Sequence, residues 1–145
     1  MEIEMVTGRI AQNLEHLKRF TSTPNAGCTR LPFTKETRDA VDYLRKEMEE
    51  IGLEVKEDAA GNIYGILRGT DSSLPCVMTG SHIDSVLHGG NYDGIAGVVC
   101  SLEVARQIVE MGLEHKRDLV VIGFMDEEGM RFGTGYFGSG AILGH

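Results

Sequence analysis

The sequence predicts an α/β fold, built as a partial three-layer sandwich around a mostly parallel sheet. Two observations lead to this prediction. The second half of the chain runs from an apolar segment through a glycine-rich loop and a helical segment to another apolar segment, which is the order of a βαβ unit. Residues 119–125 are continuously apolar, as expected for a strand that is covered on both faces.

Two helices are predicted in the first third of the chain. Apolar residues recur at helical spacing over residues 7–20, which indicates an amphipathic helix. A second helix is expected to begin after Thr34, whose hydroxyl suits the N-cap position, and to end before Gly52. The predicted inner face of this second helix carries Ala40, Val41, Leu44 and Met48.

Short apolar runs further along predict the strands. Residues 53–56 and 62–67 are expected to form two strands joined by a short turn. Residues 76–80 are compact and apolar, and they predict a buried strand that ends in Ser-His. A helix is expected to follow the glycine-rich loop and to end near Met111, and residues 139–145 are expected to begin a last helix.

Composition excludes several classes of function. The chain has 145 residues and a net charge of −8, from 22 acidic and 14 basic residues, which argues against a nucleic-acid partner. Its three cysteines, Cys28, Cys76 and Cys100, form no CxxC pair; Cys76 and Cys100 sit in apolar runs, and the set predicts buried thiols of a reducing compartment. No apolar stretch approaches the roughly 18 residues of a membrane span, so we expect a soluble, cytoplasmic protein with no membrane partner.

Polar side chains gather just past two of the predicted strands. His82 and Asp84 are two residues apart in an extended segment, so the carboxylate shares a face with the imidazole and can approach it. Asp93 lies in a loop with four nearby glycines, and Glu127 and Glu128 come directly after an apolar run. Open parallel sheets bind ligands at the carboxyl ends of their strands, so these residues are candidates for a site.

Each of these patterns also has an ordinary structural explanation. A lone histidine near a strand end is more often a satisfied structural residue, and a loop aspartate is often solvated or caps a helix. Two adjacent glutamates can form a solvated charge pair, but at the buried end of a sheet they repel each other and are costly to bury. A divalent metal would compensate that cost, and the three patterns together favour a metal site.

Three strings carry a resemblance to a known family: GSHIDSV at residues 80–86, GGNYDG at 89–94 and EEGMRF at 127–132. They resemble the aminoacylase and zinc-exopeptidase superfamily of the M20 type. Within it, NYDGIAG and EEGMRF resemble the amidase branch of N-carbamoyl-L-amino-acid hydrolases and allantoate amidohydrolases. Residues 27–31 and 58–62 also resemble this branch, so the resemblance spans nearly the whole chain.

The resemblance implies a zinc-exopeptidase-like catalytic domain that binds two divalent metal ions, either zinc or manganese, cobalt or nickel. By position, His82 would bind one ion, Asp93 would bridge both and Glu128 would bind the other. Glu127 would be the general base, and Asp84 would orient His82. The implied reaction is hydrolysis of a small linear amide or ureido compound, such as an N-carbamoyl-L-amino acid or allantoate, by an activated water.

Relatives in this family are far longer, with two further histidine ligands and a second domain that carries the dimer contact. By the resemblance, residues 1–145 are expected to form the N-terminal part of the catalytic domain, without the remainder and without the dimerisation domain. Full-length relatives are expected to be homodimers, and the chain alone is expected to self-associate or to pair with a separately encoded chain. A catalytically inactive fragment is therefore one alternative, and a dipeptidase or aminoacylase of the same superfamily is another.

A different function is suggested by Gly133-x-Gly135-x-x-Gly138, which matches the glycine pattern of dinucleotide-binding loops. That motif should follow a strand immediately and be answered by an acidic residue about 20 positions later. Here residues 127–132 intervene, and the sequence contains no later acidic residue. The glycine pattern therefore does not predict nucleotide binding.

Overall fold

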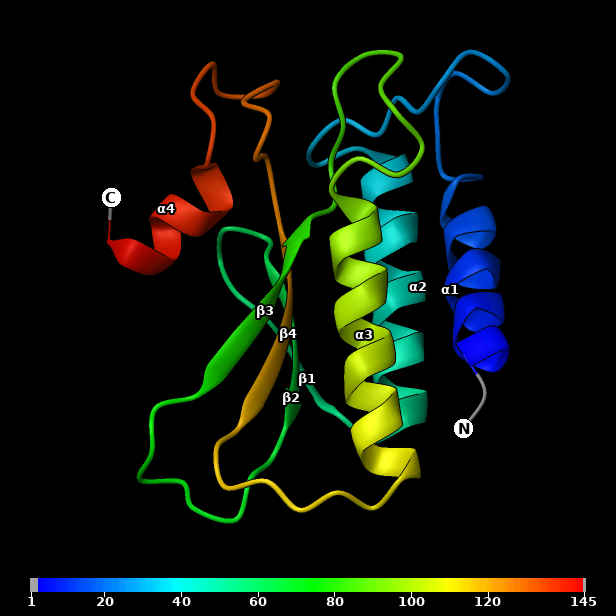
Figure 1. The fold of residues 1–145 in the computed structure, drawn as a ribbon. Helices are drawn as coiled ribbons and strands as arrows, with labels where there is room; N and C mark the ends of the chain where they lie inside the picture. Colours follow the sequence, from blue (N-terminus) through cyan, green and yellow to red (C-terminus); the bar gives the residue numbers. More distant parts are fainter. Residues whose placement is uncertain (1–2, 145) are drawn as a thin grey trace.

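The computed structural model describes residues 3–144, which form one four-stranded sheet with helices packed against it (Figure 1). The strands lie in the order β1-β2-β4-β3. Their bounds are Glu54–Glu57 for β1, Ile63–Leu67 for β2, Val77–His82 for β3 and Leu119–Phe124 for β4. The helices are α1 (Ile3–Leu17), α2 (Lys35–Ile51), α3 (Ile95–Glu110) and α4 (Phe137–Leu143).

The sheet is mixed, with one parallel and two antiparallel strand pairs. β3 and β4 pair in parallel and α3 connects them, which is the βαβ unit that the sequence predicts. β1 pairs with β2, and β2 with β4, in antiparallel orientation. The prediction of a mostly parallel sheet is therefore wrong. One cause is the short turn at residues 58–62, because a connection of this length can join only antiparallel neighbours.

Helices α2 and α3 cover one face of the sheet, and α1 packs against α3 (Figure 1). The short helix α4, seven residues long, lies on the opposite side of the sheet (Figure 1). Of the expected three-layer sandwich, the described residues thus form the sheet, one helical layer and this single short helix. Within residues 3–144, no helix is long and apolar enough to cross a membrane.

The ends of α2 follow from its sequence. Thr34 has extended backbone geometry, and its side-chain oxygen accepts a hydrogen bond from the backbone N–H of Thr37, as an N-cap does. Gly52 follows the helix with a φ of 91°, a left-handed conformation that glycine adopts without a steric penalty. The inner face contributes buried side chains to the main hydrophobic core, among them Ala40, Val41, Leu44 and Met48.

Helix α1 ends at Leu17, three residues before the predicted end at Phe20. The carbonyl oxygens of Leu17 and Phe20 accept hydrogen bonds from Nη1 of Arg30, at 3.1 and 3.2 Å. Arg30 is buried, its Nε donates to the carbonyl oxygen of Ile83 at 2.7 Å, and burial lowers the pKa of its guanidinium. Arg30 therefore ties the end of α1 to the segment that directly follows β3.

Strand β3 is less buried than its apolar sequence predicts. Val77 and Met78 are 50% and 42% exposed, and Cys76 and Cys100 are exposed, whereas Cys28 is buried. The predictions of a buried strand and of buried thiols at positions 76 and 100 are therefore wrong. The reason is the strand order, because β3 lies at the edge of the sheet and its start has no neighbour on one side. β4, between β2 and β3, is buried along nearly its whole length, as predicted.

The parallel pair of β3 and β4 determines where the polar segments meet. His82, the last residue of β3, lies opposite Phe124, the last residue of β4. The two strands therefore end at the same edge of the sheet, and the segments that follow them start side by side. The glycine-rich loop before α3 returns to this edge, because α3 must run back along the sheet to reach β4 (Figure 1).

Candidate metal centre

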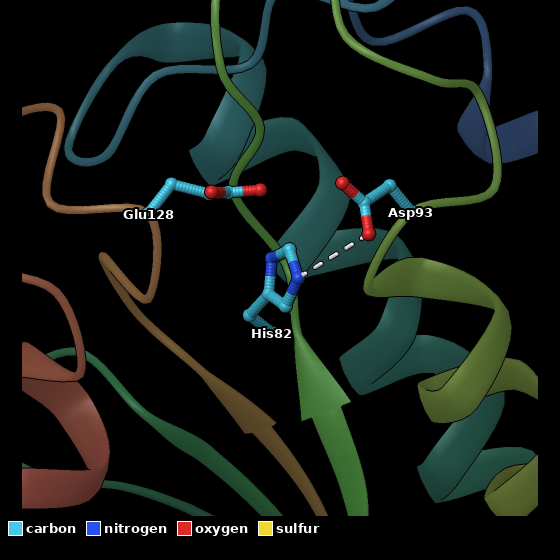
Figure 2. A group of neighbouring side chains, drawn as sticks. All are labelled: His82, Asp93 and Glu128. Carbon is cyan, nitrogen blue, oxygen red and sulfur yellow. Dashed lines mark ion pairs between the residues drawn. The ribbon is translucent and has the colours of Figure 1, made fainter.

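Three side chains from three separate segments meet at this edge. His82 comes from the end of β3, Asp93 from the loop before α3 and Glu128 from the segment after β4. Each offers one ligand atom, and these atoms all lie within 4.8 Å of one another. Figure 2 shows the two carboxylates pointing toward each other across the imidazole ring of His82. The structure thus brings the three predicted metal ligands together, and their role as ligands stays a prediction.

The hydrogen bond of His82 determines which ring nitrogen is available. Nδ1 lies 2.9 Å from the backbone carbonyl oxygen of Asp84. A carbonyl oxygen only accepts hydrogen bonds, so this contact assigns the ring proton to Nδ1 and leaves the lone pair of the neutral imidazole on Nε2. Nε2 lies 3.8 Å from Oδ1 of Asp93 and 3.9 Å from Oε2 of Glu127. The ring therefore presents its free lone pair to the acidic groups.

The carboxylate of Asp84 has a different partner from the one that the sequence predicts. Its Oδ1 lies 3.8 Å from Nδ1 of His82, which is too long for a hydrogen bond. Its two oxygens instead accept hydrogen bonds from the backbone N–H groups of Glu127, at 3.1 Å, and Glu128, at 3.3 Å. Asp84 thus contacts the imidazole through its main chain and the acidic segment through its side chain.

Gly94 allows the loop of Asp93 to approach the imidazole. A Cβ atom at this position would lie 2.5 Å from ring atoms of His82, and the backbone has a φ of +66°. Both the contact distance and the backbone conformation disfavour any residue with a side chain. The glycine after Asp93 therefore brings this loop against the ring.

The acidic groups differ in their exposure to solvent. The side chain of Asp93 is 57% exposed and that of Glu127 is 30% exposed. Burial raises the pKa of Glu128; His82 opposes this shift, and the neighbouring carboxyl groups of Glu127 and Asp93 add to it. Burial also raises the pKa of Asp84, against the effect of its two backbone hydrogen bonds and of His82. Such crowding of carboxyl groups is the situation that a bound cation relieves.

The donor atoms suit a divalent transition metal. One imidazole nitrogen with carboxylate oxygens is a set that zinc, manganese, cobalt and nickel all accept. Nε2 of His82 carries the lone pair, and its other nitrogen is held by Asp84, which is the usual arrangement around a metal-bound histidine. The residues present therefore fit a divalent transition metal.

Sequence reasoning missed Asn62, which is fully buried near this edge. Its side-chain oxygen accepts a hydrogen bond from the backbone N–H of Met125, at the end of β4. The residue lies in the stretch 58–62 that carries part of the family resemblance, and this was the one signal that could have identified it. Packing explains one glycine of the pattern that resembles a dinucleotide-binding loop. A Cβ atom on Gly138 would lie 2.2 Å from Oδ1 of Asn62.

Comparisons with known proteins agree with the sequence resemblance. The chain is 45% identical over 136 residues to an N-carbamoyl-L-amino-acid amidohydrolase of Paenarthrobacter aurescens, covering 94% of this chain and 33% of the relative. It is 39% identical over 139 residues to an allantoate amidohydrolase of Bacillus subtilis, covering 96% and 34%. The chain therefore spans about a third of the length of these relatives.

A solved structure and a family model also match most of the chain. A crystal structure of a hydantoinase/carbamoylase family amidase from Burkholderia ambifaria matches with a TM-score of 0.90 and 32% identity, covering 94% of this chain and 34% of that one. Residues 62–143 match the model of peptidase family M28, whereas the sequence strings resemble the M20 type. Because residues 62–143 make up more than half of the chain, the chain belongs to peptidase family M28.

Proposed function

We propose that this chain forms part of the catalytic centre of a metal-dependent amidohydrolase. The observation that carries the proposal is the convergence of His82, Asp93 and Glu128, with ligand atoms within 4.8 Å of one another at the carboxyl edge of β3 and β4. The relatives named as amidohydrolases supply the reaction class, hydrolysis of a carbon–nitrogen bond outside peptides.

In this proposal His82 would hold one divalent ion through Nε2, Glu128 would hold a second, and Asp93 would contribute to both. Bound divalent ions would polarise the carbonyl of the substrate and acidify a water molecule. The three residues fix the position at which this happens, because each is anchored on a different element of the fold. One imidazole nitrogen and carboxylate oxygens are ligands that zinc, manganese, cobalt and nickel all accept, so these four ions are the candidates.

Glu127 is proposed as the general base. Its side chain is partly exposed, and its Oε2 lies 3.9 Å from Nε2 of His82, beside the proposed ligands. Its backbone N–H is held by Asp84. A carboxylate in this position can take a proton from an attacking water and return it to the leaving nitrogen.

The proposed substrates are small linear amides or ureido compounds. Relatives of this chain are named for N-carbamoyl-L-amino acids, allantoate and ureidoglycolate, which all contain a ureido group. A dipeptidase or aminoacylase activity is the second candidate, and the family name, which denotes peptidases, favours it. The chain spans about a third of these relatives, so the proposal assigns it part of a catalytic centre, and residues 1–145 alone are expected to hydrolyse these compounds poorly.

Metal titration of the purified chain tests the proposal before any substrate is needed. We expect Zn²⁺ and Mn²⁺ to bind in calorimetry, and His82→Ala to weaken binding by about tenfold or more, since removing a ligand should cost at least as much as removing an outer-shell partner. His88→Ala is the matched control, because His88 is exposed and contacts the carbonyl of Ala26 instead. Equal binding by wild type and His82→Ala would rule out the site.

Substrate assays distinguish the two candidate reactions. The metal-loaded protein should be tested with N-carbamoyl-L-amino acids, allantoate and dipeptides in parallel. Release of ammonia or of the free amino acid from the ureido compounds, with no cleavage of dipeptides, would support the amidohydrolase. Metal binding with cleavage of dipeptides alone would favour the peptidase instead. Metal binding without any turnover would identify the chain as a catalytically inactive fragment.

A further inference from the structure

The segment that carries the two glutamates is held on both sides by hydrogen bonds. We call Met125–Glu128 the acid segment. The backbone N–H groups of residues 136–138 donate to its carbonyl oxygens: Tyr136 to Glu127 at 2.8 Å, Phe137 to Asp126 at 3.2 Å and Gly138 to Met125 at 2.9 Å. The carbonyl side of the acid segment is therefore fixed by the chain that leads into α4.

On the other side of the acid segment, side-chain oxygens accept hydrogen bonds from its backbone N–H groups. Oδ1 of Asn62 accepts from Met125 at 3.0 Å, and the carboxylate of Asp84 accepts from Glu127 and Glu128. Strand pairing ends at Phe124, so these N–H groups have no neighbouring strand to bond with. Asn62 accepts the hydrogen bond of the first N–H group after β4, that of Met125.

Asn62 reaches both sides of this arrangement. Its amide nitrogen donates to the carbonyl oxygen of Gly138 at 2.9 Å and to Oδ2 of Asp58 at 2.8 Å. An asparagine amide has one acceptor and two donor hydrogens, and all three functions are used here. A buried side chain with this set of partners costs free energy if any partner is removed, so it favours a single conformation.

Gly138 is matched to Asn62 by its lack of a side chain. A Cβ atom on Gly138 would lie 2.2 Å from Oδ1 of Asn62 and 2.6 Å from the carbonyl oxygen of Met125. Both contacts are far inside van der Waals distance, so any larger residue would push the amide away from the acid segment. Asn62 and Gly138 therefore form a close-packed joint beside the end of β4.

We infer that Asn62 is a positioning residue for Glu127 and Glu128, and this inference rests on the proposed metal-dependent function. By holding the N–H of Met125 and the carbonyl of Gly138 together, Asn62 fixes the direction in which the acid segment leaves β4. The side chain of Glu128 then faces His82 and Asp93 before any ligand binds. Asn62 acts through the backbone of the acid segment and touches no reacting atom.

The test compares three variants of the full 145-residue chain. Asn62→Ala removes the joint, and Gly138→Ala displaces the amide while leaving the residue present. Tyr64→Phe is the matched control, because it removes the hydrogen bond from Tyr64 to Asp58 at the outer end of the same network and leaves Met125 and Gly138 untouched. Each variant is measured by amide hydrogen exchange of residues 125–128 and by Zn²⁺ titration, with circular dichroism to verify the fold.

We expect Asn62→Ala and Gly138→Ala to lose exchange protection at Met125 and to weaken Zn²⁺ binding by about 10- to 100-fold, the range for outer-shell partners of metal ligands. Tyr64→Phe should retain both properties. The loss of affinity should disappear when Glu128→Gln is already present, because the misplaced carboxylate then no longer contributes. A purely structural role would not produce this dependence on Glu128.

The two measurements separate failure of the inference from failure of the proposed function. If the wild-type chain binds no Zn²⁺, the metal proposal fails and hydrogen exchange alone decides whether Asn62 holds the acid segment. Unchanged protection at residues 125–128 in Asn62→Ala and Gly138→Ala would overturn the inference. Lost protection with unchanged Zn²⁺ affinity would also overturn it, because the acid segment would then not need the joint. If Asn62→Ala does not fold, Gly138→Ala, in which Asn62 is still present but its amide is displaced, decides the inference in both measurements.

Discussion

The backbone carbonyl of Asp84 lies 2.9 Å from Nδ1 of His82, while the carboxylate of the same residue accepts the backbone N–H groups of Glu127 and Glu128. One residue thus links the strand end that carries the histidine with the segment that carries the two glutamates. The geometry of the candidate centre depends on this link, because the histidine comes from the first strand of the βαβ unit and the glutamates follow its second strand.

Asp84→Asn should therefore disturb the glutamates more than the histidine. One carboxylate oxygen becomes an NH₂ group that faces a backbone N–H, and a donor facing a donor leaves a buried group unsatisfied, at about 1–3 kcal/mol. The contact of His82 uses the main chain of Asp84 and should persist. We expect a lower free energy of unfolding by urea denaturation and Zn²⁺ binding weakened by about 10- to 100-fold.

Asp71→Asn is the control for this substitution, since Asp71 is exposed and its side chain bonds to the nearby Ser73. It should leave Zn²⁺ affinity unchanged and alter the free energy of unfolding little. Equal effects of the two substitutions would show that the carboxylate of Asp84 does not hold the glutamate segment.

Gly94→Ala tests the close approach of the Asp93 loop to His82. Two costs are expected: a backbone conformation with a φ of 66° and a ψ of −61°, which a residue with a Cβ rarely adopts and which costs about 1–3 kcal/mol, and the contact at 2.5 Å with the imidazole. Gly112→Ala separates them, because Gly112 has a similar φ of +61° and a Cβ atom there would meet nothing within 4 Å. Both variants should lose stability in urea, Gly94→Ala by more, and only Gly94→Ala should weaken Zn²⁺ binding. Equal behaviour of the two would mean that the contact with the ring is unimportant.

The approximate place of the candidate centre could be predicted from the sequence, because parallel strands joined by a helix end at the same edge of a sheet. His82 is the last residue of β3, Glu128 follows β4, and the loop of Asp93 leads into the connecting helix. These relations depend on local sequence patterns, namely apolar runs and the polar residues that directly follow them. The contacts that hold the site together are not local, and they could not be predicted in the same way.

Asp84 and Asn62 show the difference. The spacing of His82 and Asp84 predicts that their side chains share a face, but the carboxylate turns to backbone groups 43 and 44 residues away. Asn62 similarly bonds to Met125 and Gly138, which lie 63 and 76 residues away. The antiparallel place of β2 beside β4 is also nonlocal, since alternation of apolar residues carries no information on which strands become neighbours.

The stability of the chain should decrease in acid through Asp58. Burial opposes ionisation of Asp58, but hydrogen bonds from Tyr64, Asn62 and the backbone of Ala60 outweigh it and lower the pKa of this carboxyl group. A folded-state pKa below the unfolded value of about 3.9 means that the stabilisation is present above that pH and is lost as the pH falls through the folded pKa. Urea denaturation between pH 7 and about pH 3 should show this loss.

Tyr64→Phe isolates this contribution, because it removes the hydrogen bond from the phenol to Oδ2 of Asp58. At pH 7 the substitution should cost about 1–2 kcal/mol, as expected for a hydrogen bond to a charged acceptor that is partly exposed. The difference between wild type and Tyr64→Phe should shrink as Asp58 is protonated. A difference that stayed constant down to the acid end of the titration would show that the charge of Asp58 does not strengthen this bond.

Glu127 and Glu128 are adjacent in sequence but are predicted to fail in different ways. Glu127→Gln keeps the size of the side chain and cannot take a proton, so metal content should be retained. In any form of the protein that turns over substrate, the rate should fall by about 10²–10⁴-fold, the usual contribution of a general base. Glu128→Gln should instead lower metal content, because a neutral amide is a poorer ligand for a divalent ion than a carboxylate.

Elemental analysis after gel filtration measures the metal, and Glu114→Gln, at an exposed position, is the control. If metal were lost in Glu127→Gln and kept in Glu128→Gln, the assignments of base and ligand would have to be exchanged.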